Sequence, residues 1–122
     1  EIAQCLVGSE MCKETDHDES VALARLTAQR ITQTGQPLRG QDGVRYIYFD
    51  TYDNRMVYES SDETPRNEPT FRLLADADCP AVLVEQCFLT NPQDAARLAT
   101  PSGAKQAAKA YYEAICEWME GR

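Results

Sequence analysis

Apolar and polar residues follow one another along the chain in blocks whose spacing predicts strands and helices in turn. Residues 2–12 are apolar enough for a strand, interrupted by Gly8, where a bulge or a close backbone approach fits. Residues 44–49 are rich in aromatic and β-branched side chains and predict a second strand. Residues 81–84 form a short continuous apolar run, which is typical of a central strand covered on both faces.

Two segments have the spacing of amphipathic helices. Residues 13–19 predict a polar loop, in which Asp16 and Glu19 have the spacing of a helix N-cap with its capping box. The helix that follows extends to about Thr34 and stops at Gly35, since a left-handed residue at that position costs glycine nothing. Its buried row consists of Val21, Ala24, Ala28 and Ile31.

The end of the chain predicts two more helices. Asn91-Pro92 and Thr100-Pro101 each resemble an N-cap followed by proline at the first helical position, where the missing N–H does no harm. The first pair predicts a short helix and the second a long one. The apolar face of the long helix is predicted to consist of Ala104, Ala108, Tyr111, Ile115 and Trp118.

Strands that alternate with amphipathic helices predict an α/β fold. We expect a three-layer sandwich with a mostly parallel or mixed central sheet flanked by helices. At 122 residues the chain is at most one domain, residues 1–122.

Residues 50–69 are polar, contain Pro65 and Pro69, and predict a long loop. A loop of that length is often functional, and a lid over a substrate is one interpretation of it.

Charge and composition exclude some partners. Acidic residues outnumber basic ones by 20 to 12, and the resulting net charge of −8 repels phosphate backbones and anionic lipid surfaces. Nucleic acid and membrane are therefore not expected as partners.

The chain starts at Glu1 without Met or a leader, so we expect a processed or truncated piece. The five cysteines show no C-x-x-C spacing, and buried free thiols are the default interpretation.

Glu85 is the strongest candidate for chemistry, because it follows four apolar residues and is expected at the carboxyl end of a buried strand. Open α/β sheets place their ligand sites at that end. The alternative is a structural carboxylate that accepts hydrogen bonds from the following loop.

His17 is the only histidine, and it is expected to lie exposed in a loop. Since a hydrolytic zinc site needs three protein ligands, His17 alone predicts no metal site, and nothing pairs it with Cys87 as base and nucleophile.

The segment from Cys79 to Asp94, CPAVLVEQCFLTNPQD, resembles the closing motif of the zinc-dependent N-acetylmuramoyl-L-alanine amidases of cell-wall and phage lytic enzymes. In that motif a buried strand ends in the catalytic glutamate, and a Phe and an Asn-Pro helix start follow. Gly8-Ser9-Glu10 and Arg39-Gly40 resemble further parts of the family. The chain departs from the family at Cys87, where a glycine is common, and in the length of residues 50–69.

The resemblance implies hydrolysis of the amide between N-acetylmuramic acid and L-alanine, with peptidoglycan as the substrate and an extracellular or cell-wall location. Glu85 is the implied catalytic residue and Arg39 an implied substrate-binding residue. Zinc is the implied cofactor, but the family's ligands, two histidines and a glutamate, precede Gly8 in an N-terminal half that this chain lacks. We therefore expect the isolated chain to be inactive unless a complementary N-terminal chain or a swapped homo-oligomer completes it. The alternatives are a non-catalytic peptidoglycan-binding or regulatory module of the same fold, and an unrelated α/β domain in which Glu85 is structural.

Overall fold

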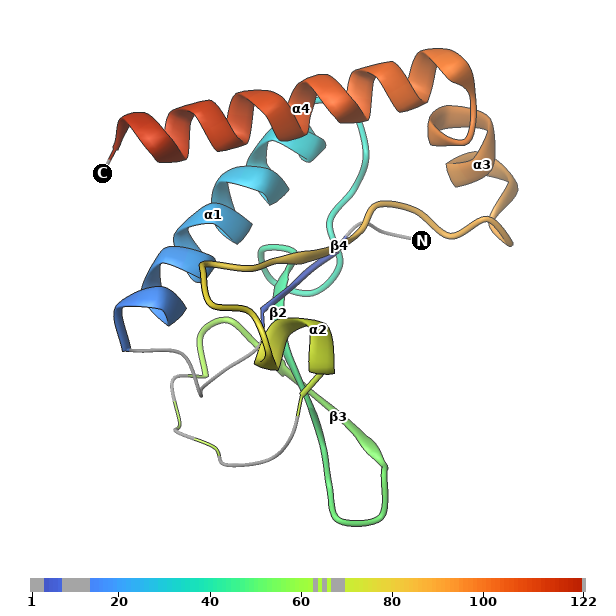
Figure 1. Cartoon of the computed structure of the whole chain (residues 1–122). Coiled ribbons are helices and arrows are strands. Elements are labelled where there is room, and N and C mark those ends of the chain that lie inside the picture. Colours follow the sequence, from blue (N-terminus) through green and yellow to red (C-terminus); the bar gives the residue numbers. More distant parts are fainter. Residues whose placement is uncertain (1–3, 8–13, 63, 65, 67–69, 122) are drawn as a thin grey trace.

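Helices and strands alternate through much of the chain, as the α/β prediction requires (Figure 1). The computed structural model describes residues 4–7, 14–62, 64, 66 and 70–121. The strands are β1 (Gln4–Val7), β2 (Val44–Phe49), β3 (Arg55–Glu59) and β4 (Leu83–Glu85). The helices are α1 (Glu14–Thr32), α2 (Arg72–Ala75), α3 (Pro92–Leu98) and α4 (Pro101–Glu120). The mixed α/β class is confirmed, and Gly8 lies outside the described residues.

The strands form a mixed sheet in the order β3-β2-β1-β4. β1 is parallel to β2 and antiparallel to β4, while β2 is antiparallel to β3. The prediction of a central, fully covered strand at residues 81–84 is wrong. β4 is a half-buried outer strand of the described sheet and includes only residues 83–85. Ala81 lies outside the strand, and its N–H donates to the hydroxyl of Ser20 on α1 instead (2.9 Å).

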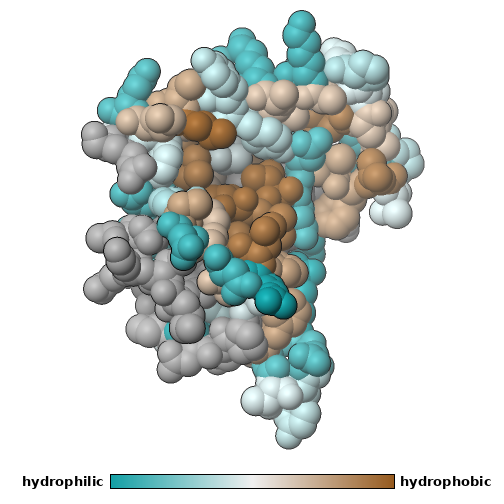
Figure 2. Space-filling model, in the orientation of Figure 1, coloured by the Kyte–Doolittle hydropathy of each residue, from teal (hydrophilic) through white to brown (hydrophobic). Residues whose placement is uncertain are grey.

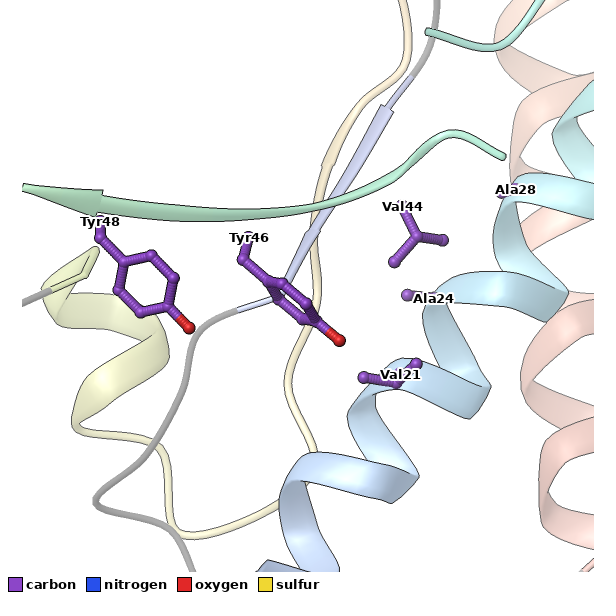
Figure 3. Packing of buried hydrophobic residues seen from close by; sticks show 6 residues of the cluster. All are labelled: Val21, Ala24, Ala28, Val44, Tyr46 and Tyr48. Atoms are coloured by element: carbon purple, nitrogen blue, oxygen red, sulfur yellow. The ribbon is translucent and has the colours of Figure 1, made fainter. Parts of the chain in front are cut away.

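The main core lies between α1 and β2 (Figure 3). Residues three or four apart on the helix meet alternate residues of the strand, because these spacings each repeat one face. The buried side chains are Val21, Ala24 and Ala28 of α1 and Val44, Tyr46 and Tyr48 of β2. The predicted buried row of α1 is therefore confirmed, with Ile31 in a second cluster beside Leu98, Ala107 and Ala110.

The start of α1 differs from the prediction. The helix begins at Glu14, so Asp16 and Glu19 are helical residues and the predicted N-cap is wrong. Acidic residues stabilise the first turn of a helix, which is why this polar run continues as helix rather than loop. The predicted stop is confirmed, since Gly35 has a φ of 85°.

Residues 50–69 are not one long loop. Asp50 accepts hydrogen bonds from the N–H groups of Tyr52 and Asn54 (2.8 Å each), and this turn leads into β3. β3 pairs with β2 along its whole length, from Arg45↔Glu59 to Phe49↔Arg55. The loop prediction is wrong for residues 55–59, and a lid role stays a prediction for the rest.

Helix α4 packs on α1 and α3 through a face of small residues. Gly103, Ala107, Ala110 and Ala114 are its buried positions. The predicted apolar face is confirmed for Tyr111, which packs against the second core cluster, and wrong for Ala104 and Ala108, which are exposed, and for Ile115, which is 46% exposed. The buried face is therefore displaced around the helix. Small residues let two backbones approach closely, so the large apolar side chains remain at the margin of the contact. Among the described residues, no helix combines the length and apolarity needed to cross a membrane.

Candidate functional site

Glu85 is the last residue of β4 and lies opposite Gln4 of β1 in antiparallel register. The prediction that Glu85 lies at the carboxyl end of its strand is confirmed, although the strand is half-buried rather than buried. Because β4 is antiparallel to β1, this end lies beside the amino end of β1, a direction that the apolar run did not reveal. Val84 packs against the core beneath α1, so strand alternation directs half-buried Glu85 toward the opposite face of the sheet.

The segment after Glu85 is fixed by contacts with α4 and with the second core cluster. The Tyr111 hydroxyl donates to Gln86 Oε1 at 2.5 Å. Cys87 packs against the cluster of Ile31 and Leu98. Burial raises the pKa of the Cys87 thiol, and the nearby Asp94 carboxylate raises it further. Cys87 is therefore disfavoured as a nucleophile, because the thiolate is the reactive form.

A turn from Phe88 to Asn91 leads into α3. The Asn91 N–H donates to the Phe88 carbonyl (2.9 Å), and Asn91 Oδ1 accepts from the N–H groups of Gln93 (2.9 Å) and Asp94. With Pro92 at the start of the helix, the predicted N-cap is confirmed. The second one is confirmed too, since Thr100 Oγ1 accepts from the Gly103 N–H at 3.0 Å.

Asp94 is a site residue that sequence reasoning missed. Its side chain is buried, and Oδ2 accepts from the Phe88 N–H at 3.2 Å. Burial alone would raise the pKa of Asp94, but hydrogen bonds from Phe88 and from the Gln36 side chain keep that pKa below its usual value. The available signal was its place three residues after the N-cap, where an acidic side chain often turns back to bind backbone N–H groups.

Arg39 is brought to the same loop from the turn after α1. Its guanidinium lies over the Phe88 ring, 5.7 Å from the centroid. Leu38, next to it, packs against the second core cluster together with Cys87. The sequence predicted Glu85 and Arg39 separately, and the structure places them on neighbouring segments of one region.

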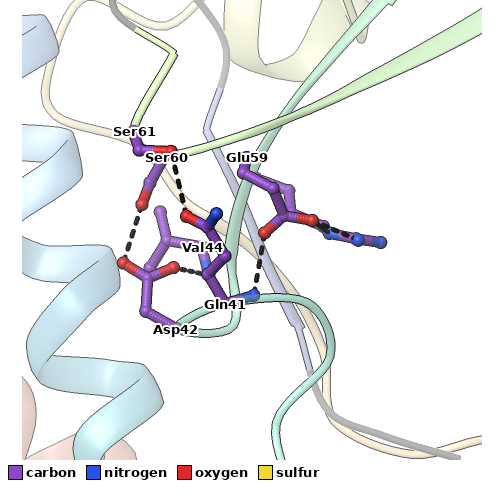
Figure 4. A network of polar contacts seen from close by, with 7 residues as sticks. Gln41, Asp42, Val44, Glu59, Ser60 and Ser61 are labelled. Carbon is purple, nitrogen blue, oxygen red and sulfur yellow. Dashed lines mark hydrogen bonds and ion pairs between the residues drawn. The ribbon is translucent and has the colours of Figure 1, made fainter.

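The turn that carries Arg39 is held by the β2–β3 hairpin (Figure 4). Glu59 Oε2 accepts from the Gln41 N–H at 3.0 Å, and Glu59 Oε1 accepts from the Arg45 guanidinium. Asp42 accepts from the Val44 N–H (3.0 Å) and the Ser60 hydroxyl (2.7 Å). Arg45 lowers the pKa of Glu59, so the carboxylate stays charged. Two of these contacts, at the N–H groups of Gln41 and Val44, fix the backbone of the turn.

The described residues do not fit a metal site. No group of three His, Cys, Asp or Glu side chains is placed to hold an ion in the part of the chain that the structure covers. His17 is half-buried on α1, with its ring 5.5 Å from the Tyr46 ring centroid. The prediction of an exposed loop histidine is therefore wrong, because α1 begins three residues earlier and carries His17 against the sheet.

Comparison with known proteins bears on this arrangement. The family described as N-acetylmuramoyl-L-alanine amidase matches residues 8–117. Among solved structures, an N-acetylmuramyl-L-alanine amidase from Mycobacterium smegmatis is similar in fold, with a TM-score of 0.69 and 22% sequence identity. That match includes 98% of this chain and 47% of the mycobacterial chain, so this chain spans about half the length of the similar structure. No curated protein sequence matches the chain significantly.

Proposed function

Because the chain belongs to the N-acetylmuramoyl-L-alanine amidase family, we propose that it forms part of a peptidoglycan hydrolase. The bond cleaved is the amide between N-acetylmuramic acid and the L-alanine of the stem peptide. The observation that carries the proposal is the position of Glu85, a half-buried carboxylate at the end of β4 beside a loop fixed by Tyr111, Asn91 and Asp94. A carboxylate on a strand end next to a fixed loop can exchange a proton with a reacting group that binds beside it.

In this proposal Glu85 acts as general base and then as general acid. It takes a proton from the attacking water and delivers that proton to the nitrogen of the departing L-alanine. Arg39, beside Phe88, contacts the substrate.

We propose that the complete enzyme depends on zinc held by residues outside this chain, where the ion would activate the carbonyl and the water. The described side chains do not fit a zinc site, so the isolated chain is expected to retain no stoichiometric zinc. It is also expected to be inactive, because one carboxylate does not make an active site.

Additional polypeptide is proposed to complete the three-layer sandwich. β4 is an outer strand of the described sheet, and the exposed apolar side chains of α4 include Tyr112, Ile115 and Met119. Apolar surface also gathers in the middle of the face shown in Figure 2, below α4. Exposed apolar surface and an outer strand each favour a packing partner. A complementary N-terminal chain or a swapped homo-oligomer fits, and the location would be the cell wall or the extracellular space.

The test compares the isolated chain with the full-length protein on purified peptidoglycan. Mass spectrometry would follow the release of stem peptides with a free L-alanine amino group. We expect release by the full-length protein and none by the isolated chain, whose zinc content is measured in parallel. Release of any other fragment, or none from the full-length protein with zinc supplied, contradicts the amidase proposal.

The second candidate is a non-catalytic peptidoglycan-binding or regulatory module with the same fold. Cosedimentation of the full-length protein with cell-wall sacculi, without release of peptides, would support this candidate.

A further inference from the structure

Four arginines of the described chain are half-buried, and Arg39 differs from the other three in its surroundings. Arg30 pairs with Glu117, Arg45 with Glu59, and Arg66 with Asp62. Within the described residues, Arg39 has no carboxylate partner, and its contact is with the face of Phe88. A half-buried arginine without an acidic neighbour can pair with an anion, and the net charge of −8 makes such an arginine unusual in this chain.

The position of Arg39 is fixed on both sides. Phe88 holds the guanidinium from one side, and cation–π contact leaves its N–H edge available for hydrogen bonds. Behind it, the turn passes through Gly40 at φ 74°, a conformation that favours glycine.

Glu59 fills the space behind this turn. A Cβ on Gly40 would lie 2.3 and 2.5 Å from the two Glu59 carboxylate oxygens. The same carboxylate accepts from the N–H of Gln41, two residues after Arg39. Glu59 and the Arg39 turn are therefore packed directly on each other.

We propose that Arg39 is the subsite for a carboxylate of the substrate's peptide and that Glu59 positions it through the Gly40-Gln41 backbone. The proposal rests on the proposed function for its substrate class. Planar guanidinium and carboxylate groups pair through two parallel hydrogen bonds, so small shifts of the Arg39 turn would weaken the pair strongly.

The test measures peptide binding to the 122-residue chain by NMR titration. The probes are a soluble muramoyl peptide with free carboxylates and the same peptide with its carboxylates amidated. We expect the free form to bind on the order of 10-fold more tightly, because hydrogen bonds to charged groups are the stronger ones. Arg39→Gln is expected to remove this preference.

Glu59→Gln separates positioning from general stability. It is expected to reduce the carboxylate preference several-fold while affinity for the amidated peptide stays the same. A merely structural role would weaken both peptides equally. The matched control, Asp76→Asn, removes the carboxylate of the Arg72–Asp76 pair on α2 and is expected to leave the preference intact.

Three results would overturn the proposal: no difference between the two peptides in the unaltered chain, including no binding of either; a preference that survives Arg39→Gln; or an equal loss for both peptides in Glu59→Gln. These results leave the amidase proposal untouched, since that is tested by peptide release in the full-length protein.

Discussion

The packing of α4 on α3 makes a sharp prediction at Gly103. A Cβ at this position would lie 2.1 Å from the Arg97 carbonyl oxygen and 2.7 Å from Leu98 Cα, both backbone atoms of α3. Backbone cannot rotate away, so Gly103→Ala must push α3 and α4 apart. Overpacking of this kind costs about 3 kcal/mol, against a gain in helix propensity of about 1 kcal/mol. We expect the free energy of unfolding to fall by about 2 kcal/mol.

Urea unfolding followed by circular dichroism measures this loss, and two other glycines provide matched controls. Gly121→Ala meets atoms no closer than 3.5 Å and should change stability by less than about 0.5 kcal/mol. Gly35→Ala meets nothing within 4 Å but keeps a φ of 85°, so it measures backbone strain alone, about 1 kcal/mol. If Gly103→Ala were as stable as Gly121→Ala, the close α3–α4 contact would be wrong.

Three further predictions concern the cap of α3, the charge of Glu59 and the reactivity of two cysteines. Asn91→Ala should lower the free energy of unfolding by about 1 kcal/mol in urea melts, because two N–H groups of α3 lose their acceptor; an unchanged midpoint would refute the cap. The hydrogen bond from Arg45 lowers the pKa of Glu59, so the charged Glu59 carboxylate stabilises the folded chain. This stabilisation is fully present above the ordinary glutamate pKa and is lost as the pH falls through the lowered value. Acid titration of Glu59→Gln should therefore show a shallower loss of stability than the unaltered chain, and parallel curves would refute this. Iodoacetamide should modify exposed Cys79 well before Cys87, whose thiol pKa is raised by burial, and equal rates by peptide mass mapping would contradict the packing of Cys87.

The parts of the fold that local chemistry determines were predictable. Aromatic and β-branched residues define β2 as residues 44–49, and the Asn-Pro and Thr-Pro pairs locate the starts of α3 and α4. The left-handed residue after α1 is the glycine expected there. Each of these features depends on a few adjacent residues, so tertiary contacts did not change them.

Features that depend on distant partners were not predictable. β3 has exposed and half-buried residues in alternation and looked like loop until its pairing with β2 was known. The apolar face of α4 was largely misplaced because its buried face consists of glycine and alanine, which carry a weak apolar signal.

The candidate site also combines residues that the sequence revealed with residues that only the folded structure revealed. Glu85 was found from its place after an apolar run, and the family resemblance gave its role and added Arg39. Asp94, Glu59 and Phe88 became visible as supports only in three dimensions. The direction of β4, which decides the sheet edge at which Glu85 lies, is set by pairing with β1 and has no local signal.

The central claim is that Glu85 carries the proton in amide hydrolysis, and the kcat of Glu85→Gln in the full-length protein tests it most directly. The amide keeps the size of the side chain but cannot exchange a proton, so kcat for release of L-alanine amino termini should fall by about 10² to 10⁴-fold. Glu113→Gln, a half-buried residue of α4 that pairs with Lys109, is the control and should keep normal activity. A Glu85→Gln variant with correct folding and a kcat within about threefold of the unaltered enzyme would contradict the account.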